Sequence, residues 1–313
     1  MKKVSIMIPC YNEEENVVPI SEAVVAQLEQ LPQYDYEILF IDNCSQDNTR
    51  PLLREICAKN PKIRAIFNSK NFGQFNSPYH GLCQTSGDCT ISLCCDFQDP
   101  VEMIPRLLEE WEKGYKIVCA VKTSSKENKL MYALRSVYYR MIKKMSSVEQ
   151  IEPFTGFGLY DKTFIQVLRD LGDPTPFIRG IVAELGPKIK LIEYEQAKRR
   201  AGKTHNNFFS LYDAAMLSFT SYTKIGLRLA SFLGMLMSGG SFLAAIVCLI
   251  LKLIDPAYFF TTGTVAIILT ILFVGGLQLF FIGFSGEYIL SINARAMKRP
   301  LVIEEERINF DEK

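Results

Sequence analysis

The residues best suited to chemistry lie in one short segment, ISLCCDFQDP at 91–100. An apolar, strand-like run ends there in Asp96, Gln98 and Asp99, followed by Pro100. Carboxylate and amide oxygens are hard ligands that suit Mg²⁺ or Mn²⁺ carrying the phosphates of a substrate. A strand followed by an ordinary Asp-Pro turn would produce the same ten residues. The segment alone therefore supports two interpretations, a metal-and-phosphate site and a simple turn.

Two earlier strand-like runs, 4–8 and 36–41, also end in polar turns. The polar-turn residues of interest are Pro9, Tyr11 and Glu13 after the first run and Asp42 and Asp47 after the second. Strand-like and helix-like segments alternate from residue 4 to 121, which predicts an α/β fold with a mostly parallel sheet covered on both faces. Ligands of such sheets bind at the carboxyl ends of the strands. The three turns are therefore expected to form one site.

Two basic segments follow this region. Residues 126–145 carry apolar side chains at helical spacing with basic residues on the other faces. Such a helix either lies on a membrane surface or packs on the core. The second segment, 196–205, is a basic loop that contains Arg199, Arg200, Lys203 and His205. Its glycine and its place before an apolar region favour anion binding over a solvated run of charge.

The C-terminal third contains two long apolar runs. No charged residue occurs from 229 to 251 or from 257 to 286, and a membrane-spanning helix needs roughly 20 such residues. The expected organisation is a soluble domain at 1–205, a juxtamembrane helix at 206–228, a transmembrane hairpin at 229–289 with helices at about 229–251 and 262–286, and a tail at 290–313. Basic residues flank the outer ends of the hairpin, so both termini are expected in the cytoplasm.

Composition excludes several other classes of protein. The formal net charge of +1 argues against a nucleic-acid binder, which usually carries a basic excess. Nine cysteines without a CxxC pair, together with only two histidines, argue against a zinc site. Reduced thiols in a cytosolic domain without an N-terminal signal are the expected state.

Taken in order, the motifs of this chain resemble the family-2 glycosyltransferases of the polyprenyl-phosphate type, which include dolichol-phosphate mannose synthases and bactoprenol glucosyltransferases. The motifs that carry the resemblance are IPCYNEEENV, IDNCSQDNT, NFGQFNSPYHGL, SGDCTISLCCDFQDP, TGFGLYDK, RRAGKT and GEYILSINARAMKRP. The likeness covers nearly the whole chain. Several ordered motifs followed by a hairpin are more specific than any one of them.

The resemblance implies a Rossmann-like nucleotide-sugar domain of the glycosyltransferase-A type, Mg²⁺ or Mn²⁺ as cofactor, and inverting transfer. The donor would be a nucleotide sugar, a UDP-hexose ahead of a GDP-sugar, and the acceptor a polyprenyl phosphate. The product would serve the modification of cell-envelope glycans at a bacterial inner membrane. The resemblance also suggests a homo-oligomer, a tetramer.

Site residues can be carried over by position. Pro9, Tyr11, Glu13, Asp42 and Asp47 would line the nucleoside pocket, Asp96 and Gln98 would hold the metal and the donor diphosphate, and Lys122, Arg199, Arg200, Lys203 and His205 would bind phosphate. The residues expected to act in catalysis are Asp96, Gln98, Asp99 and Arg199. Four positions depart from the family pattern: Asn43 and Cys94 stand where acids are common, Gly156 where Asp is common, and Gly158 where Arg is common. Cys94 leaves Asp96 as the only carboxylate of the DxD-like motif.

A phosphate acceptor is already anionic near neutral pH and needs no strong general base. A second interpretation is transfer to a hydroxyl of a lipid-linked glycan, for which Asp99 or Glu184 would be the base. A processive polysaccharide synthase is disfavoured because two spans are few for a polymer channel. The QxxRR segment at 196–200 also lacks the tryptophan that such synthases carry after the arginine, since the sole tryptophan of the chain is Trp111. The non-enzyme alternative is a decayed site that binds a nucleotide sugar or scaffolds a membrane complex.

Overall fold

The computed structural model describes residues 1–123, 154–197, 199–201, 263–297 and 299–310, together with residue 151 and short runs or single residues between 212 and 254. The basic helix expected at 126–145 and the predicted phosphate ligands Lys203 and His205 lie outside the described residues. Those predictions therefore stay predictions.

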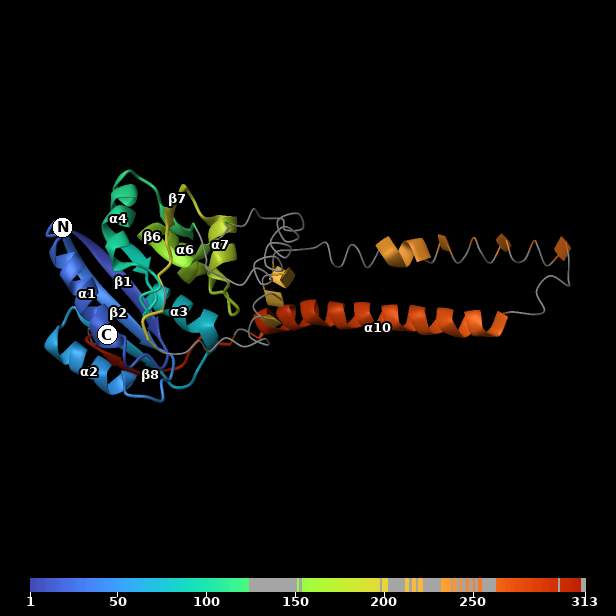
Figure 1. Cartoon of the computed structure of the whole chain (residues 1–313), viewed down its shortest axis with the longest axis horizontal. Coiled ribbons are helices and arrows are strands. Elements are labelled where there is room, and N and C mark those ends of the chain that lie inside the picture. Colours follow the sequence, from blue (N-terminus) through green and yellow to red (C-terminus); the bar gives the residue numbers. More distant parts are fainter. Residues whose placement is uncertain are drawn as a thin grey trace.

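Figure 1 shows a layered α/β domain with a long helix that leads away from it. The elements in chain order are β1 (Lys2–Cys10), α1 (Val17–Glu29), β2 (Tyr34–Asp42), α2 (Thr49–Lys59), β3 (Ile63–Asn68), α3 (Gly73–Gln84), β4 (Cys89–Ser92), the 3₁₀ turn η1 (Val101–Met103), α4 (Ile104–Glu112), β5 (Ile117–Lys122), β6 (Phe154–Asp161), α6 (Lys162–Leu171), α7 (Ile178–Leu185), β7 (Ile189–Tyr194), α10 (Gly263–Ala296) and β8 (Glu304–Ile308). The described strands form one sheet in the order β7-β5-β6-β4-β1-β2-β3-β8.

The central strands are parallel, as the alternating pattern predicts. β1 pairs in parallel with β2 and β4, and β2 pairs in parallel with β3. Alternate residues of one strand enter different cores: Ile38 and Phe40 join one buried cluster, whereas Leu39 and Ile41 join the other. Because successive side chains of a strand point to opposite faces, this division means that both faces of the sheet are covered.

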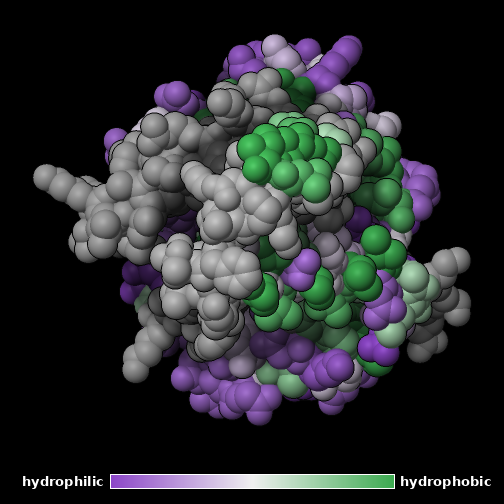
Figure 2. Space-filling model, turned by 90° about the vertical axis from the view of Figure 1, so that its right-hand side faces the viewer, coloured by the Kyte–Doolittle hydropathy of each residue, from purple (hydrophilic) through white to green (hydrophobic). Residues whose placement is uncertain are grey.

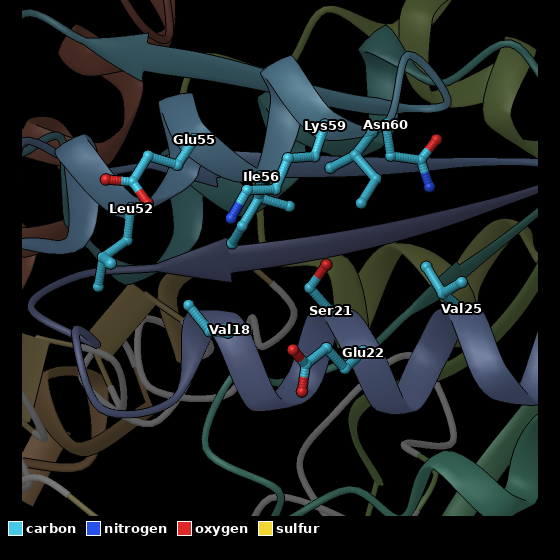
Figure 3. A pocket seen from close by; sticks show the side chains of 10 residues that line it. Val18, Ser21, Glu22, Val25, Leu52, Glu55, Ile56, Lys59 and Asn60 are labelled. Carbon is cyan, nitrogen blue, oxygen red and sulfur yellow. The ribbon is translucent and has the colours of Figure 1, made fainter.

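The two sides of the sheet are covered by different helices. The side chains of α1, α2 and α4 pack in the cluster that contains Ile38, and those of α3, α6 and α7 pack in the cluster that contains Leu39. A groove of about 220 Å³ runs between α1 and α2, lined by residues that include Val18, Val25 and Ile56. Figure 3 shows Glu22, Glu55 and Lys59 on the two helices that border this groove.

Two strands go beyond the expected elements. β6 runs antiparallel between β4 and β5, although no strand was predicted for this segment. Gly158 allows this close approach, because a Cβ atom there would lie 2.4 Å from the backbone oxygen of Val118. β8 lies in the tail predicted at 290–313 and pairs antiparallel with β3. The sheet is therefore completed by residues that follow the apolar region.

One helix of the described residues is long and apolar enough to cross a membrane. It is the part of α10 from Phe273 to Ala296, with a mean hydropathy of 1.4 in its most apolar window and none of that window buried. The described residues between 232 and 254 are helical, and Met235 and Leu253 among them are exposed. Membrane crossing, the second apolar helix of the hairpin and the domain boundaries stay predictions. Seen along α10 toward the domain, hydrophobic side chains gather over the middle of the picture and hydrophilic ones form much of the rim (Figure 2).

Candidate active site

The polar turns after β1, β2 and β4 meet at one edge of the sheet, where they border a cavity of about 620 Å³, the larger cavity. Its lining residues are Pro9, Tyr11, Glu13, Asn43, Asn71, Gly73, Gln74, Phe75, Cys94, Cys95, Asp96, Gln98, Arg199 and Asp213. The predicted site residues Pro9, Tyr11, Glu13, Asp96, Gln98 and Arg199 are thus brought together. This is the position at which open α/β sheets bind ligands.

A second cavity of about 350 Å³, the smaller cavity, adjoins the first and shares Pro9, Gln74, Phe75 and Cys94 with it. Its other lining residues are Pro78, Tyr79, Leu82, Ser92, Asp99, Thr155, Gly156, Phe157, Pro176, Phe177, Ile178 and Arg179. Phe75 and Phe177 meet edge to face, with ring centroids 5.8 Å apart. The smaller cavity is thus largely aromatic and aliphatic.

Three charged side chains face one another in the larger cavity. Arg199 forms an ion pair with Glu13, and its Nε atom lies 3.6 Å from Oδ2 of Asp96. Burial raises the pKa of Glu13, against the opposing effects of a hydrogen bond from Asn16 and of the Arg199 charge. The guanidinium therefore bridges the turn after β1 and the turn after β4.

The turn that contains Asp96 has a fixed local shape. The N–H of Gln98 donates to Oδ1 of Asp96 over 3.1 Å, and Phe97 between them takes a left-handed φ of 59°. The N–H of Arg200 donates to the backbone oxygen of Asp96 over 3.2 Å, and the Arg200 guanidinium lies 5.1 Å from the ring centroid of Phe97. Arg200 thus supports this turn from the basic loop.

The fit of a divalent ion can be judged from these oxygens. Within the described residues there is no group of three His, Cys, Asp or Glu side chains that could hold a metal. Asp96 and Gln98 supply two oxygen ligands on the cavity wall, and Mg²⁺ commonly takes one or two protein ligands and completes its shell with substrate phosphates and water. These residues fit a cation that arrives with a diphosphate. Metal binding itself stays a prediction.

Asp42 and Asp47 do not line either cavity. Asp42 is completely buried, accepts from the N–H of Ser45 over 3.1 Å, and lies 2.7 Å from Nε of Arg50. Asp47 accepts from the backbone N–H groups of Thr49 and Glu14. Both acids organise the turn after β2, and the nucleoside contacts predicted for them stay predictions.

Asn43 explains one of the departures from the family pattern. Its Nδ2 donates to Oδ1 of Asn71 over 2.9 Å and to the backbone oxygen of Gly73 over 3.2 Å. Its Oδ1 accepts from the N–H of Phe72 over 2.9 Å. An ionised aspartate accepts hydrogen bonds but cannot donate them, so it would lose both contacts through which Asn43 ties the turn after β2 to the residues around the start of α3.

Asp99 occupies the wall of the smaller cavity with both oxygens engaged. Oδ2 accepts from the N–H of Cys94 over 3.1 Å, and Oδ1 accepts from the hydroxyl of Tyr194 over 3.0 Å. Burial raises the pKa of Asp99. Through the first of these bonds, Asp99 holds the backbone at Cys94, close to Asp96.

Lys122, one of the predicted phosphate ligands, ends β5 opposite Tyr194 and lines neither cavity. Its role in phosphate binding stays a prediction.

Sequence reasoning missed several residues of the larger cavity. Asn71, Gly73, Gln74 and Phe75 come from one of the motifs that carry the resemblance, but no role was assigned to them. Gly73 begins α3 with a left-handed φ of 87°, a conformation that favours glycine. Asp213 comes from the predicted juxtamembrane helix, and no pattern in that segment distinguished it.

Comparison with known proteins agrees with the resemblance. The family model described as glycosyl transferase family 2 matches residues 5–186, more than half of the chain, so the chain belongs to glycosyltransferase family 2. It is 30% identical over 304 residues to the prophage bactoprenol glucosyl transferase homolog of Escherichia coli K12, which covers 96% of this chain and 98% of that protein. It is 31% identical over 301 residues to the bactoprenol glucosyl transferase of Shigella phage SfX, covering 95% and 97%. The predicted resemblance to the polyprenyl-phosphate type is confirmed.

A solved structure resembles the domain more distantly. Glucosyl-3-phosphoglycerate synthase from Mycobacterium tuberculosis superposes with a TM-score of 0.45 at 16% identity, covering 69% of this chain and 76% of that chain.

Proposed function

We propose that this glycosyltransferase moves a hexose from a UDP-hexose to a membrane polyprenyl phosphate with inversion at the anomeric carbon. The observation that carries the proposal is the placement of Asp96 and Gln98 next to Arg199 in one cavity. An acid and an amide suit a cation-bound diphosphate, and a guanidinium beside them suits a second phosphate. The relatives named bactoprenol glucosyl transferases support a lipid acceptor.

The state of the candidate bases favours phosphate over a hydroxyl as the acceptor group. Both oxygens of Asp99 already accept hydrogen bonds, and Glu184 is exposed and lines neither cavity. A sugar hydroxyl needs a base to remove its proton, whereas a phosphate oxygen is already anionic. Asp213, at the exposed rim of the larger cavity, is the acid to test against this conclusion.

In the proposed reaction, the nucleotide lies in the larger cavity and the hexose extends toward the smaller one. A phosphate oxygen of the acceptor forms a bond to the anomeric carbon while the bond from that carbon to the donor diphosphate breaks. Asp96 and Gln98 orient the departing diphosphate, whose charge a bound Mg²⁺ or Mn²⁺ would partly neutralise. Arg199 holds the acceptor phosphate in line and reduces the repulsion between two anions.

A lipid acceptor accounts for the apolar helix. We infer that α10 crosses a bacterial inner membrane and that the catalytic domain and both termini are cytoplasmic, so that the cavity lies near the lipid phosphate. The two-helix hairpin and the tetramer belong to the same proposal. The product would be a lipid-phosphate sugar for modification of cell-envelope glycans.

The test is a donor panel with the purified full-length protein in liposomes that contain polyprenyl phosphate. Labelled UDP- and GDP-sugars are supplied with Mg²⁺ or Mn²⁺, and the lipid product is identified by mass. Asp96→Ala should lose at least about 100-fold of the transfer rate, whereas the exposed-site control Asp170→Ala should retain it. Full activity of Asp96→Ala would contradict the metal and diphosphate role. A second set of liposomes carries a lipid-linked glycan in place of polyprenyl phosphate, and product formed only there would favour the hydroxyl acceptor. The absence of both transfer and donor hydrolysis would favour a binding scaffold.

A further inference from the structure

Arg50, near the start of α2, connects three segments that are distant in sequence. Its Nε lies 2.7 Å from Oδ2 of Asp42 at the end of β2, and its Nη2 donates to the backbone oxygen of Asn68 at the end of β3 over 2.5 Å. Its Nη1 donates to Oε2 of Glu305 in β8 over 2.9 Å. Each guanidinium nitrogen therefore serves a different strand. Arg50 lines neither cavity.

From Asp42, a chain of hydrogen bonds leads to one wall of the larger cavity. Asp42 accepts from the N–H of Ser45, and the hydroxyl of Ser45 accepts from the N–H of Asn12 over 2.8 Å. Asn12 has a left-handed φ of 53° and stands between Tyr11 and Glu13, which both line the cavity. The position of these two residues thus depends on the turn that Arg50 holds.

From Asn68, a second chain leads to another part of the same wall. Nδ2 of Asn68 donates to Oδ1 of Asn43 over 3.2 Å. Asn43 lines the cavity and donates to the backbone oxygen of Gly73, which also lines it. Asn68 is completely buried, so displacement of its backbone would disturb Asn43 directly.

The third partner belongs to the strand that returns from the apolar helix. β8 follows α10 in the chain, and the backbone oxygen of Ile303 accepts from both the N–H and the hydroxyl of Ser69 at the end of β3. Glu305 is the β8 side chain that reaches Arg50, and its side chain is 55% exposed whereas that of Arg50 is 17% exposed. The pair is therefore accessible at one end and connected to the buried turn at the other.

We propose that Arg50 is a positioning residue that couples the docking of β8 to the nucleotide wall of the larger cavity. The proposal rests on the proposed function for the nature of the ligand. Lysine cannot replace Arg50, because a single ammonium group lacks the planar fork that reaches three acceptors at once. Transferase activity is then greatest when the chain after the apolar helix is docked on the sheet.

The test measures nucleotide binding to the full-length protein in nanodiscs, with UDP and GDP as probes in the presence of Mn²⁺, by calorimetry. Arg50→Lys should weaken the affinity for the bound nucleotide about tenfold, and Glu305→Gln about threefold, although neither residue touches the cavity. The matched control is Arg54→Gln, on the same helix, because Arg54 pairs with Glu306 of the same strand over 2.6 Å. Its effect should stay within about twofold.

Steady-state kinetics and thermal midpoints separate positioning from simple stabilisation. We expect Arg50→Lys and Glu305→Gln to raise the donor KM with little change in kcat, because they alter a binding wall rather than the reacting groups. Lower thermal midpoints with unchanged nucleotide affinity would overturn the proposal. Since Glu305 is half-exposed, its variant should fold even where Arg50→Lys does not. A wild-type protein that binds neither UDP nor GDP would instead refute the proposed donor site, and this inference with it.

Discussion

The two cavities share four residues but differ in what their walls offer. The larger one is bordered by Glu13, Asp96 and Arg199, charged groups that lie within ion-pair distance of one another. The smaller one is bordered mainly by rings and aliphatic side chains, and its acid, Asp99, is already hydrogen-bonded through both oxygens. A cluster of charges on a cavity wall suits a charged ligand, whereas a hydrogen-bonded acid among rings suits recognition by shape. The contrast supports the proposed placement of the diphosphate in the larger cavity and of the hexose in the smaller one.

The largest effect should come from the guanidinium of the larger cavity. Arg199→Gln is expected to reduce transfer about 100-fold or more, because it removes the cation between two phosphates. Arg199→Lys should recover part of the loss, since it restores the charge without the fork. The neighbouring Arg200→Gln, which loses a contact with Phe97, should cost far less. The measurement is the rate of lipid-product formation, and equal losses for the Arg199→Gln and Arg200→Gln variants would contradict the comparison.

A change of shape in the smaller cavity should have a separate signature. Phe177→Leu removes the edge-to-face contact with Phe75 and is expected to lower kcat/KM for the sugar donor about tenfold. The affinity for free UDP should stay the same, because UDP lacks the hexose. Leu171→Ala, at an exposed position on α6, is the control. A parallel loss of UDP binding would mean that the two cavities form one undivided site.

Asp99 provides a test through pH. Its pKa in the folded protein is raised by burial. Between the ordinary carboxyl pKa of about 3.9 and this raised pKa, the folded state binds more protons than the unfolded state. The contribution of Asp99 to the free energy of unfolding therefore decreases as pH rises through this range. The difference in that free energy, wild type minus Asp99→Asn, should fall correspondingly in denaturant titrations. A difference that rises with pH would show that Asp99 is stabilised as a carboxylate.

The smallest effect is expected away from both cavities, at Glu304 in β8. Burial acts to raise the pKa of Glu304, but hydrogen bonds from His80 and Arg307 outweigh it and lower the pKa to about 2. The resulting stabilisation is present above the ordinary pKa of about 4.3 and is lost as pH falls toward 2. Glu304→Gln should flatten the acid limb of the stability profile by about 1 kcal/mol, with Glu306→Gln as control. UDP affinity at neutral pH should change less than in Glu305→Gln.

Local patterns predicted the parallel core and the edge where the turns meet, because strand periodicity and turn residues are short-range signals. They did not predict β6 or β8. β6 contains Gly156 and Gly158, and glycine weakens a strand pattern. β8 has the sequence EEERI, whose charged residues are poor strand formers, and its pairing with β3 depends on contacts far along the chain.

The candidate site was predictable as a set of positions but not as a set of roles. Asp42, Asp96 and Asp99 all follow apolar strands in the sequence. In the structure only Asp96 lines the larger cavity, whereas Asp42 is buried against Arg50 and Asp99 accepts from Tyr194. Partners remote in sequence decide which carboxylate oxygens remain available to a ligand. The amino-acid sequence alone does not reveal those partners.

The chain order of the sheet has a consequence for biosynthesis. β7 and β8 belong to one sheet, but α10 and its preceding apolar run lie between them in sequence. The free edge of β3 can therefore be covered only after the apolar segment has been synthesised. An uncovered strand edge invites pairing with other chains, so the last strand also acts as a late closing step for the domain. Pairing of β8 with β3 therefore couples completion of the sheet to completion of the apolar segment.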